Sequence, residues 1–324
     1  MKKGTIGCLI AAGVFVVGCF LFLILASVLL NGLGGGEEFV QGPKIAHIDL
    51  DGVISSQGTG SIFGGGGESM VDRMKESLKK AREDEEVKAI VIRVNSPGGE
   101  VTASDTIYHA VKEANEEKPV VIFMDSMAAS GGYYVSCGAT EILANETTLT
   151  GSIGVIVQTL NYVDLFDKVG LAAESFTSGD FKDTLSGART MRPEERAYVE
   201  SLVMQMFDRF ATVVSEGRDI PIGKLKQQIA DGRVYTGKEA LENGLVDANG
   251  YLEDAYERAR ELGDAPDAKV KHMKHEPTLF EAIFMGVRQW GSGGETRVEL
   301  DISDRLLPRL EPGMMYYLPA HYAP

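Results

Sequence analysis

The chain has 324 residues, of which 44% are hydrophobic, so it is long enough for one sizeable core together with a membrane segment or a small second unit. Its formal net charge of −15 argues against a nucleic-acid partner, because no surplus of lysine and arginine is available to neutralise phosphates. The three cysteines share no short ligand spacing, so they predict neither a disulfide framework nor a zinc site.

The N-terminal region contains an uncharged segment, Ile6–Leu30, that is long enough to cross a hydrocarbon layer roughly 30 Å thick. Two lysines precede it and two glutamates follow it, so the positive-inside rule places the N-terminus in the cytoplasm. A cleaved signal peptide is the alternative, but its apolar core normally runs for only about 7 to 15 residues. We therefore expect residues 1–34 to hold a retained single-pass anchor, with everything after them outside the cytoplasm.

Strands and helices are then expected to alternate. Strands are predicted at residues 44–53, 87–94 and 119–124, helices at 69–84 and 101–116, and a mobile Gly- and Ser-rich loop at 55–67. This order favours repeated βαβ units and an α/β fold with largely parallel strands. Sites in such folds form in loops at the carboxyl ends of strands, so the Asn95–Gly99 loop is expected to lie near the loop that contains Ser130.

The stretch Asp125–Cys137 follows the third of these strands and packs small residues around Ser130 before two glycines and two tyrosines. This pattern is typical of a strand-to-helix elbow that presents a serine, because glycine lets the backbone turn sharply and approach a ligand. A packing contact between helix and sheet explains the same residues equally well. The stretch alone leaves both interpretations open.

A serine nucleophile needs an adjacent base, and histidine is the usual one. No histidine occurs between Tyr134 and Lys271, so a serine–histidine triad is poorly supported. A lysine can serve if burial disfavours its charged form. Lys182 lies in the loop Ser178–Asp183 after the strand-like stretch Leu171–Phe176, although composition alone favours a solvated loop lysine there.

The last third of the chain is predicted to be helical and then irregular. A helix begins at Pro193 with an apolar stripe suited to core or protomer packing, and Leu252–Leu262 is the last clear helix. We divide the chain into a stub and anchor (1–34), a main domain (35–262) and a C-terminal extension (263–324). Within the extension, the two Lys-His steps at 271–275 suggest flexible surface rather than a metal site.

Four ordered motifs carry a resemblance to a known family. They are Asn95–Gly99, Met127–Tyr134, Thr150–Val155 and Ser178–Asp183, and in this order and spacing they resemble the signal peptide peptidase A family. Its members are bacterial membrane-anchored serine proteases that use a serine–lysine dyad, with a fold similar to that of the caseinolytic-protease and crotonase enzymes. The resemblance runs from about Lys44 to Asp254.

The resemblance implies roles for four residues, and the geometry of the elbow adds Gly131 as a fifth candidate. Ser130 matches the nucleophile, Lys182 the general base, and Ser152 a serine that orients the lysine amine. Gly98 matches a backbone N–H donor of the oxyanion hole, and the Gly131 amide is a second candidate donor. The expected reaction is hydrolysis of remnant signal peptides and other extracytoplasmic polypeptides at the bacterial cytoplasmic membrane, with no metal or cofactor.

Single copies of the motifs match the short form of the family, which implies a homo-oligomer, for example an octamer, whose sites take the serine and the lysine from adjacent protomers. Met314–Leu318, near the C-terminus, is apolar, and its Met314–Tyr316 part also resembles short-form members, so we expect this stretch in or near the substrate groove. Two other functions stay open: a catalytically inactive scaffold in membrane quality control, and a crotonase-like acyl-CoA enzyme, which the outward-facing topology disfavours.

Overall fold

A computed structural model describes residues 42–60, 66–273 and 316–317, together with Gly18, Phe20 and Phe22. Apart from these three positions, the predicted span Ile6–Leu30 lies outside the described residues. Among the residues that are described, no helix has the length and apolar character needed to cross a membrane. One compact unit of the chain begins at Gly42.

The strands are β1 (Lys44–Asp51), β2 (Gly58–Gly60), β3 (Gly66–Ser69), β4 (Val87–Ser96), β5 (Gly99–Glu100), β6 (Val120–Ala129), β7 (Glu141–Ala144), β8 (Leu149–Gly151), β9 (Val234–Thr236), β10 (Ala248–Asn249), β11 (Lys269–His272) and β12 (Tyr316–Tyr317). The helices are α2 (Met70–Glu83), α3 (Val101–Glu117), α4 (Gly131–Ser136), α5 (Val163–Val169), α6 (Pro193–Arg218), α7 (Ile222–Lys224) with the π-helix η1 (Leu225–Ile229), α8 (Gly237–Glu242) and α9 (Leu252–Leu262).

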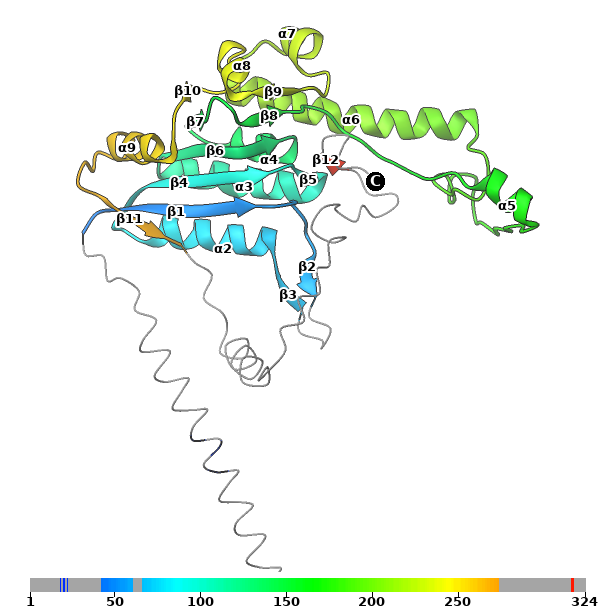
Figure 1. Cartoon of the computed structure of the whole chain (residues 1–324), viewed down its shortest axis with the longest axis horizontal. Helices are drawn as coiled ribbons and strands as arrows, with labels where there is room; N and C mark the ends of the chain where they lie inside the picture. Colours follow the sequence, from blue (N-terminus) through cyan, green and yellow to red (C-terminus); the bar gives the residue numbers. More distant parts are fainter. Residues whose placement is uncertain are drawn as a thin grey trace, which may run out of the picture. The chain divides into compact units, whose positions relative to one another are not determined.

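The main sheet confirms the predicted α/β fold with largely parallel strands (Figure 1). Its strand order is β10-β7-β6-β4-β1-β11, and each of these neighbouring pairs is parallel. β8 continues the sheet beside the end of β6 and pairs antiparallel with β9. Parallel neighbours need a crossover connection, and α2, α3 and α4 provide it between β1, β4, β6 and β7, which is the βαβ arrangement that the alternation predicts.

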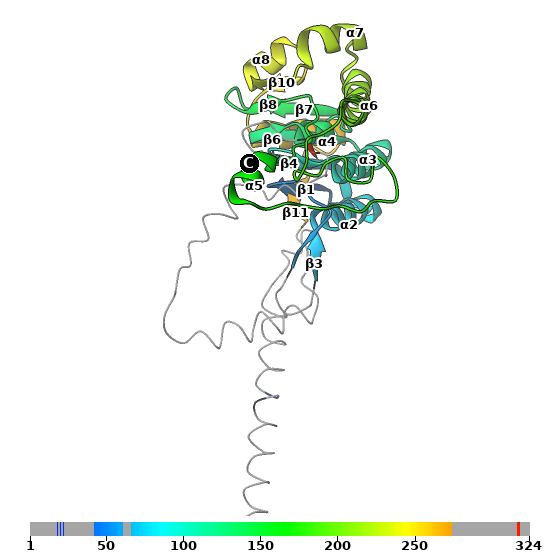
Figure 2. The same ribbon diagram turned by 90° about the vertical axis from the view of Figure 1, so that its right-hand side faces the viewer.

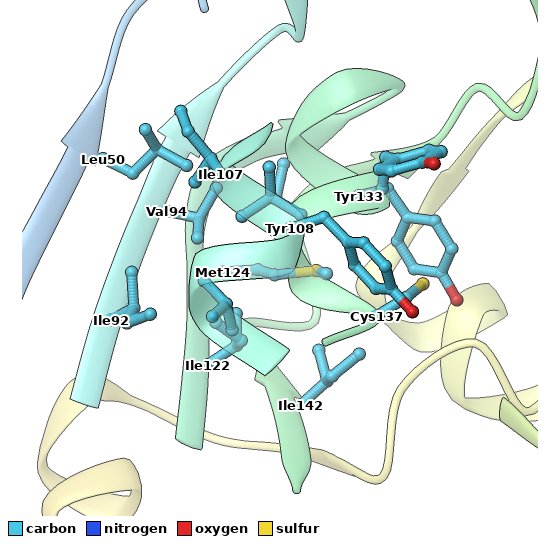
Figure 3. Close-up of a cluster of buried hydrophobic side chains, with 14 of the residues drawn as sticks. Leu50, Ile92, Val94, Ile107, Tyr108, Ile122, Met124, Tyr133, Cys137 and Ile142 are labelled. Carbon is cyan, nitrogen blue, oxygen red and sulfur yellow. The ribbon is translucent and has the colours of Figure 1, made fainter. Parts of the chain in front are cut away.

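Alternate side chains of each strand point to opposite faces of the sheet, and both faces are buried because helices pack against each of them. Figure 2 shows α2, α3 and α6 on one side of the sheet. Ile107 and Tyr108 of α3 and Tyr133 of α4 pack there with side chains of β1, β4 and β6 in one cluster (Figure 3). On the other face, Ala255 and Ala259 of α9 cover the remaining strand side chains.

Three predicted helices are confirmed to within one residue at each end: α2, α3 and α9. α2 shows why, since the Ser69 hydroxyl caps it by accepting a hydrogen bond from the Asp72 N–H at 3.1 Å, and its apolar stripe is buried. β11 lies within the segment that we assigned to the C-terminal extension. It pairs with β1, so the sheet continues beyond residue 262.

Four strand predictions need correction. β6 does not end at Met124 but continues to Ala129, because its edge pairs with β8 after β7 has ended. The predicted 55–67 loop contains β2 and the start of β3, which pair antiparallel, and β9 forms at Val234–Thr236, where no strand is predicted. Leu171–Phe176 forms no strand, because its apolar side chains have no sheet beside them and stay exposed.

Candidate active site

Ser130 lies between the end of β6 and the start of α4, as the elbow interpretation predicts. Its backbone has φ 53° and ψ −111°, a conformation that a residue with a side chain rarely adopts and that costs of order 1–3 kcal/mol. The turn is held by two hydrogen bonds: its N–H donates to the Gly151 carbonyl and its carbonyl accepts from the Tyr134 N–H, both at 2.8 Å.

The Ser130 hydroxyl is fully buried, and its Oγ has no hydrogen-bond partner among the described residues. A buried hydroxyl without a partner loses its hydration and gains nothing in return, a cost of about 1–3 kcal/mol. Strain and an unsatisfied polar atom on one side chain are typical of a functional position. This combination weighs against the interpretation of the elbow as mere packing.

The Asn95–Gly99 loop lies beside the elbow, which confirms the predicted adjacency of the two loops. β4 and β6 pair in parallel up to Ser96 and Ala128. A side chain at Gly131 would place its Cβ only 3.0 Å from the Gly99 nitrogen and 3.1 Å from the Gly98 Cα. Gly131 therefore has to be glycine, because the two loops touch through their backbones.

The two candidate oxyanion donors differ in their present partners. Gly131 is the first residue of α4, and the N–H groups of a first turn have no acceptor within their own helix. The Gly98 N–H donates to the Ser96 Oγ at 3.1 Å, and its φ of +105° suits glycine. Rotation of the Ser96 side chain would free this N–H for another acceptor. Ser96 is a residue that the sequence reasoning missed.

Ser152 is brought to the elbow by β8. The pairing of Gly151 with Ala129 places the next residue of each strand, Ser152 and Ser130, at the same end of the sheet. Ser152 is buried with φ 49°, and its N–H donates to the Arg233 carbonyl at 2.8 Å. Three of the predicted residues, together with Gly98 and its loop, thus lie around one point at the carboxyl ends of the strands.

Lys182 is not brought to this point within one chain. It is exposed, lies in a run of turns, and makes no side-chain hydrogen bond or ion pair with any described residue. It belongs to a segment, residues 156–191, that we call the arm. The arm includes α5, which has no buried residue and lies at the far end of α6 from the sheet in Figure 1.

A charged cluster fixes the loop that carries Lys182 to the start of α6. Arg189 donates to both carboxylate oxygens of Asp183 at 2.7 and 2.9 Å and also to those of Glu195, which is fully buried. Arg192 donates to Glu195 at 2.8 Å and to the Asp180 carbonyl. Hydrogen bonds from Arg189 lower the pKa of both Asp183 and Glu195. These hydrogen bonds therefore anchor the arm to the start of α6 at a point close to Lys182.

This cluster was missed by sequence reasoning, although a signal was present. Glu194 and Glu195 lie in the first turn of α6, and the basic residues Arg189 and Arg192 come just before it in the sequence. The ion pairs join residues only three to six positions apart, which is within reach of a local search of the sequence.

Comparisons with known proteins identify the family of the chain. The model of Peptidase family S49 matches residues 112–265, and the model of Clp protease matches residues 63–158. The "Putative signal peptide peptidase SppA" of Enterococcus faecium is 35% identical over 87% of this chain and 83% of its own length. "Serine protease SPPA, chloroplastic" of Arabidopsis thaliana is 35% identical over 72% of this chain and 34% of its own length. "Protease 4" of Haemophilus influenzae is 33% identical over 68% and 35%, respectively.

Proposed function

Since the chain belongs to peptidase family S49 and is a serine peptidase, we propose that it cuts peptide bonds with a Ser130–Lys182 dyad. One observation carries this assignment above all: the Ser130 hydroxyl is buried, unpartnered and held on a strained turn at a helix start. We further propose that residues 1–34 anchor the enzyme in the bacterial cytoplasmic membrane, with its active site on the outer side.

The proposed reaction is acyl transfer. Lys182, with its amine neutral and oriented by Ser152, takes the proton from the Ser130 Oγ as this oxygen attacks the substrate carbonyl. The oxyanion accepts hydrogen bonds from the N–H groups of Gly98 and Gly131, and one such donor is worth about 3–4 kcal/mol in a comparable site. Lys182 then gives its proton to the leaving amine. Water, activated by the same lysine, releases the acyl group from Ser130.

We propose that Lys182 reaches Ser130 of an adjacent protomer in a homo-oligomer. Two observations support this. Lys182 has no partner among the described residues of its own chain, and its arm exposes large apolar side chains, with Phe176 94% and Leu160 78% exposed. Contiguous exposed apolar surface marks protein interfaces, so a neighbouring subunit would cover the arm while receiving its lysine. The oligomer would be a closed ring with head-to-tail contacts, for example an octamer.

The proposed substrates are signal-peptide remnants and other extended polypeptides outside the cytoplasm. The name of the E. faecium relative supports the first of these. A further support is the backbone beside Gly98: β5 pairs antiparallel with β12, the short strand Tyr316–Tyr317 near the C-terminus. An edge that accepts one extended segment offers main-chain hydrogen bonds to another, which is how β-strand addition binds peptides.

The function is tested by covalent labelling with a fluorophosphonate probe, which reacts with activated serines. We expect one labelled peptide, 127–136 or a fragment of it, with the label on Ser130. Labelling requires an activated hydroxyl and does not require the correct peptide substrate. A full-length, assembled protein that takes up no label would instead support the inactive scaffold.

Removal of the C-terminal residues after Glu311 tests whether Met314–Leu318 lies in or near the substrate groove. β12 occupies the edge next to Gly98, so the tail competes with a substrate for the same backbone groups. We expect the truncated protein to hydrolyse a short peptide with a lower KM and little change in kcat. An unchanged KM would show that substrate does not use this edge.

A further inference from the structure

A second cluster of chemically active side chains lies on the sheet away from the serine, where β1 meets the edge strand β11. His47 and Asp49 are two positions apart on β1, so they share one face of the sheet. His272 of β11 stands directly opposite His47 in the parallel register. The two imidazole rings are 4.3 Å apart, centre to centre.

The ligand atoms of these three residues converge. The His47 Nε2 and the Asp49 Oδ1 are 3.1 Å apart, and the available atoms of all three residues lie within 4.8 Å of one another. Two ligands of a tetrahedral zinc ion, each about 2.1 Å from the metal, are separated by about 3.4 Å. Because His272 and Asp49 are exposed at the sheet edge, a small side-chain rotation of His272 completes the set.

His47 already has the partner that a zinc-binding imidazole needs. It is buried, and its Nδ1 lies 2.8 Å from the Tyr256 hydroxyl of α9. With a metal on Nε2, the ring proton moves to Nδ1 and is donated to the Tyr256 oxygen, which fixes the tautomer and the ring orientation.

Charge in the cluster also favours a cation. Arg93 donates to Asp49 at 3.0 Å and is shared with Asp51 and Asp125. Three carboxylates thus share one guanidinium, so two negative charges stay uncompensated by it. A divalent cation at His47 would offset them, while Arg93 keeps its other two partners.

From this geometry we propose that His47, Asp49 and His272 bind a zinc ion, with water in the fourth position. Two imidazoles and one carboxylate suit Zn²⁺ better than Mg²⁺ or Ca²⁺, which prefer oxygen ligands. The ion would join β11 to β1 and so hold this edge strand against the sheet. It is separate from the reaction at Ser130, which uses no group of this cluster.

The test uses the full-length protein in detergent, freed of metal with a chelator and titrated with Co²⁺ and Zn²⁺. Tetrahedral Co²⁺ absorbs visible light, so it reports ligation directly, and displacement by Zn²⁺ gives the zinc affinity. We expect saturable binding of one ion per chain. Tyr256→Phe should weaken zinc binding by about 10-fold or more because it removes the partner of the imidazole. His272→Ala should weaken it further.

His109→Ala is the matched control, since His109 is also an exposed histidine near a carboxylate, 3.6 Å from Asp105 on α3. It should bind zinc as the unmodified protein does. The proposal is overturned if the unmodified protein gives no Co²⁺ spectrum, if His272→Ala binds with unchanged affinity, or if His109→Ala loses binding equally.

Discussion

Ser130→Ala and Lys182→Ala should each lower peptide hydrolysis by at least about 10⁴-fold, because nucleophile and base act as a unit and the loss of either stops the covalent step. Neither change should unfold the protein. The Ser130 Oγ has no hydrogen-bond partner to lose, and Lys182 lies exposed on the arm. Turnover of a fluorogenic peptide, with the oligomer checked by size-exclusion chromatography, measures both effects.

Two control variants separate the dyad from its surroundings. Ser126→Ala changes an exposed serine on the same strand, β6, and Lys168→Ala changes an exposed lysine on α5 of the same arm. Both should keep nearly full activity. Hydrolysis that survives in Ser130→Ala or Lys182→Ala would contradict the dyad, and its loss in Lys168→Ala would point to the charge of the arm instead of one amine.

The parts of the fold that sequence predicts well are those set by local pattern. α2, α3 and α9 have apolar residues at helical spacing and polar residues at their ends, so each helix is specified within its own segment. The serine elbow follows the same logic, since a buried strand, small residues and two glycines are adjacent in the chain. The adjacency of the Gly98 loop needed only the parallel order of consecutive strands.

What sequence did not predict depends on pairing between distant segments. β11 joins β1 across more than 200 residues, and no local pattern sets that register, so the pairing of His47 with His272 was out of reach. The strand prediction for Leu171–Phe176 was wrong for a different reason. Its apolar residues have the pattern of a buried strand, yet they are exposed within one chain. This is the pattern expected of a surface that a partner covers.

A second large effect is expected when two inactive variants are combined, because the arm carries Lys182 away from the Ser130 of its own chain. When Ser130→Ala and Lys182→Ala chains are co-expressed, activity should return although neither variant is active alone. In the proposed head-to-tail ring, each site would take Ser130 from one chain and Lys182 from its neighbour. With equal amounts and random assembly, about a quarter of the sites receive both intact residues, so activity should reach about a quarter of that of the unmodified protein.

This recovery separates a shared site from a site within one chain. If Lys182 folded back onto Ser130 of its own chain, every site in the mixed oligomer would lack one of the two residues and no activity would return. A chain carrying both substitutions supplies the control, because its co-expression with either single variant must give no recovery. A change of arm residue Phe176→Glu should abolish both assembly and recovery, since it places a charge on the most exposed apolar side chain of the arm.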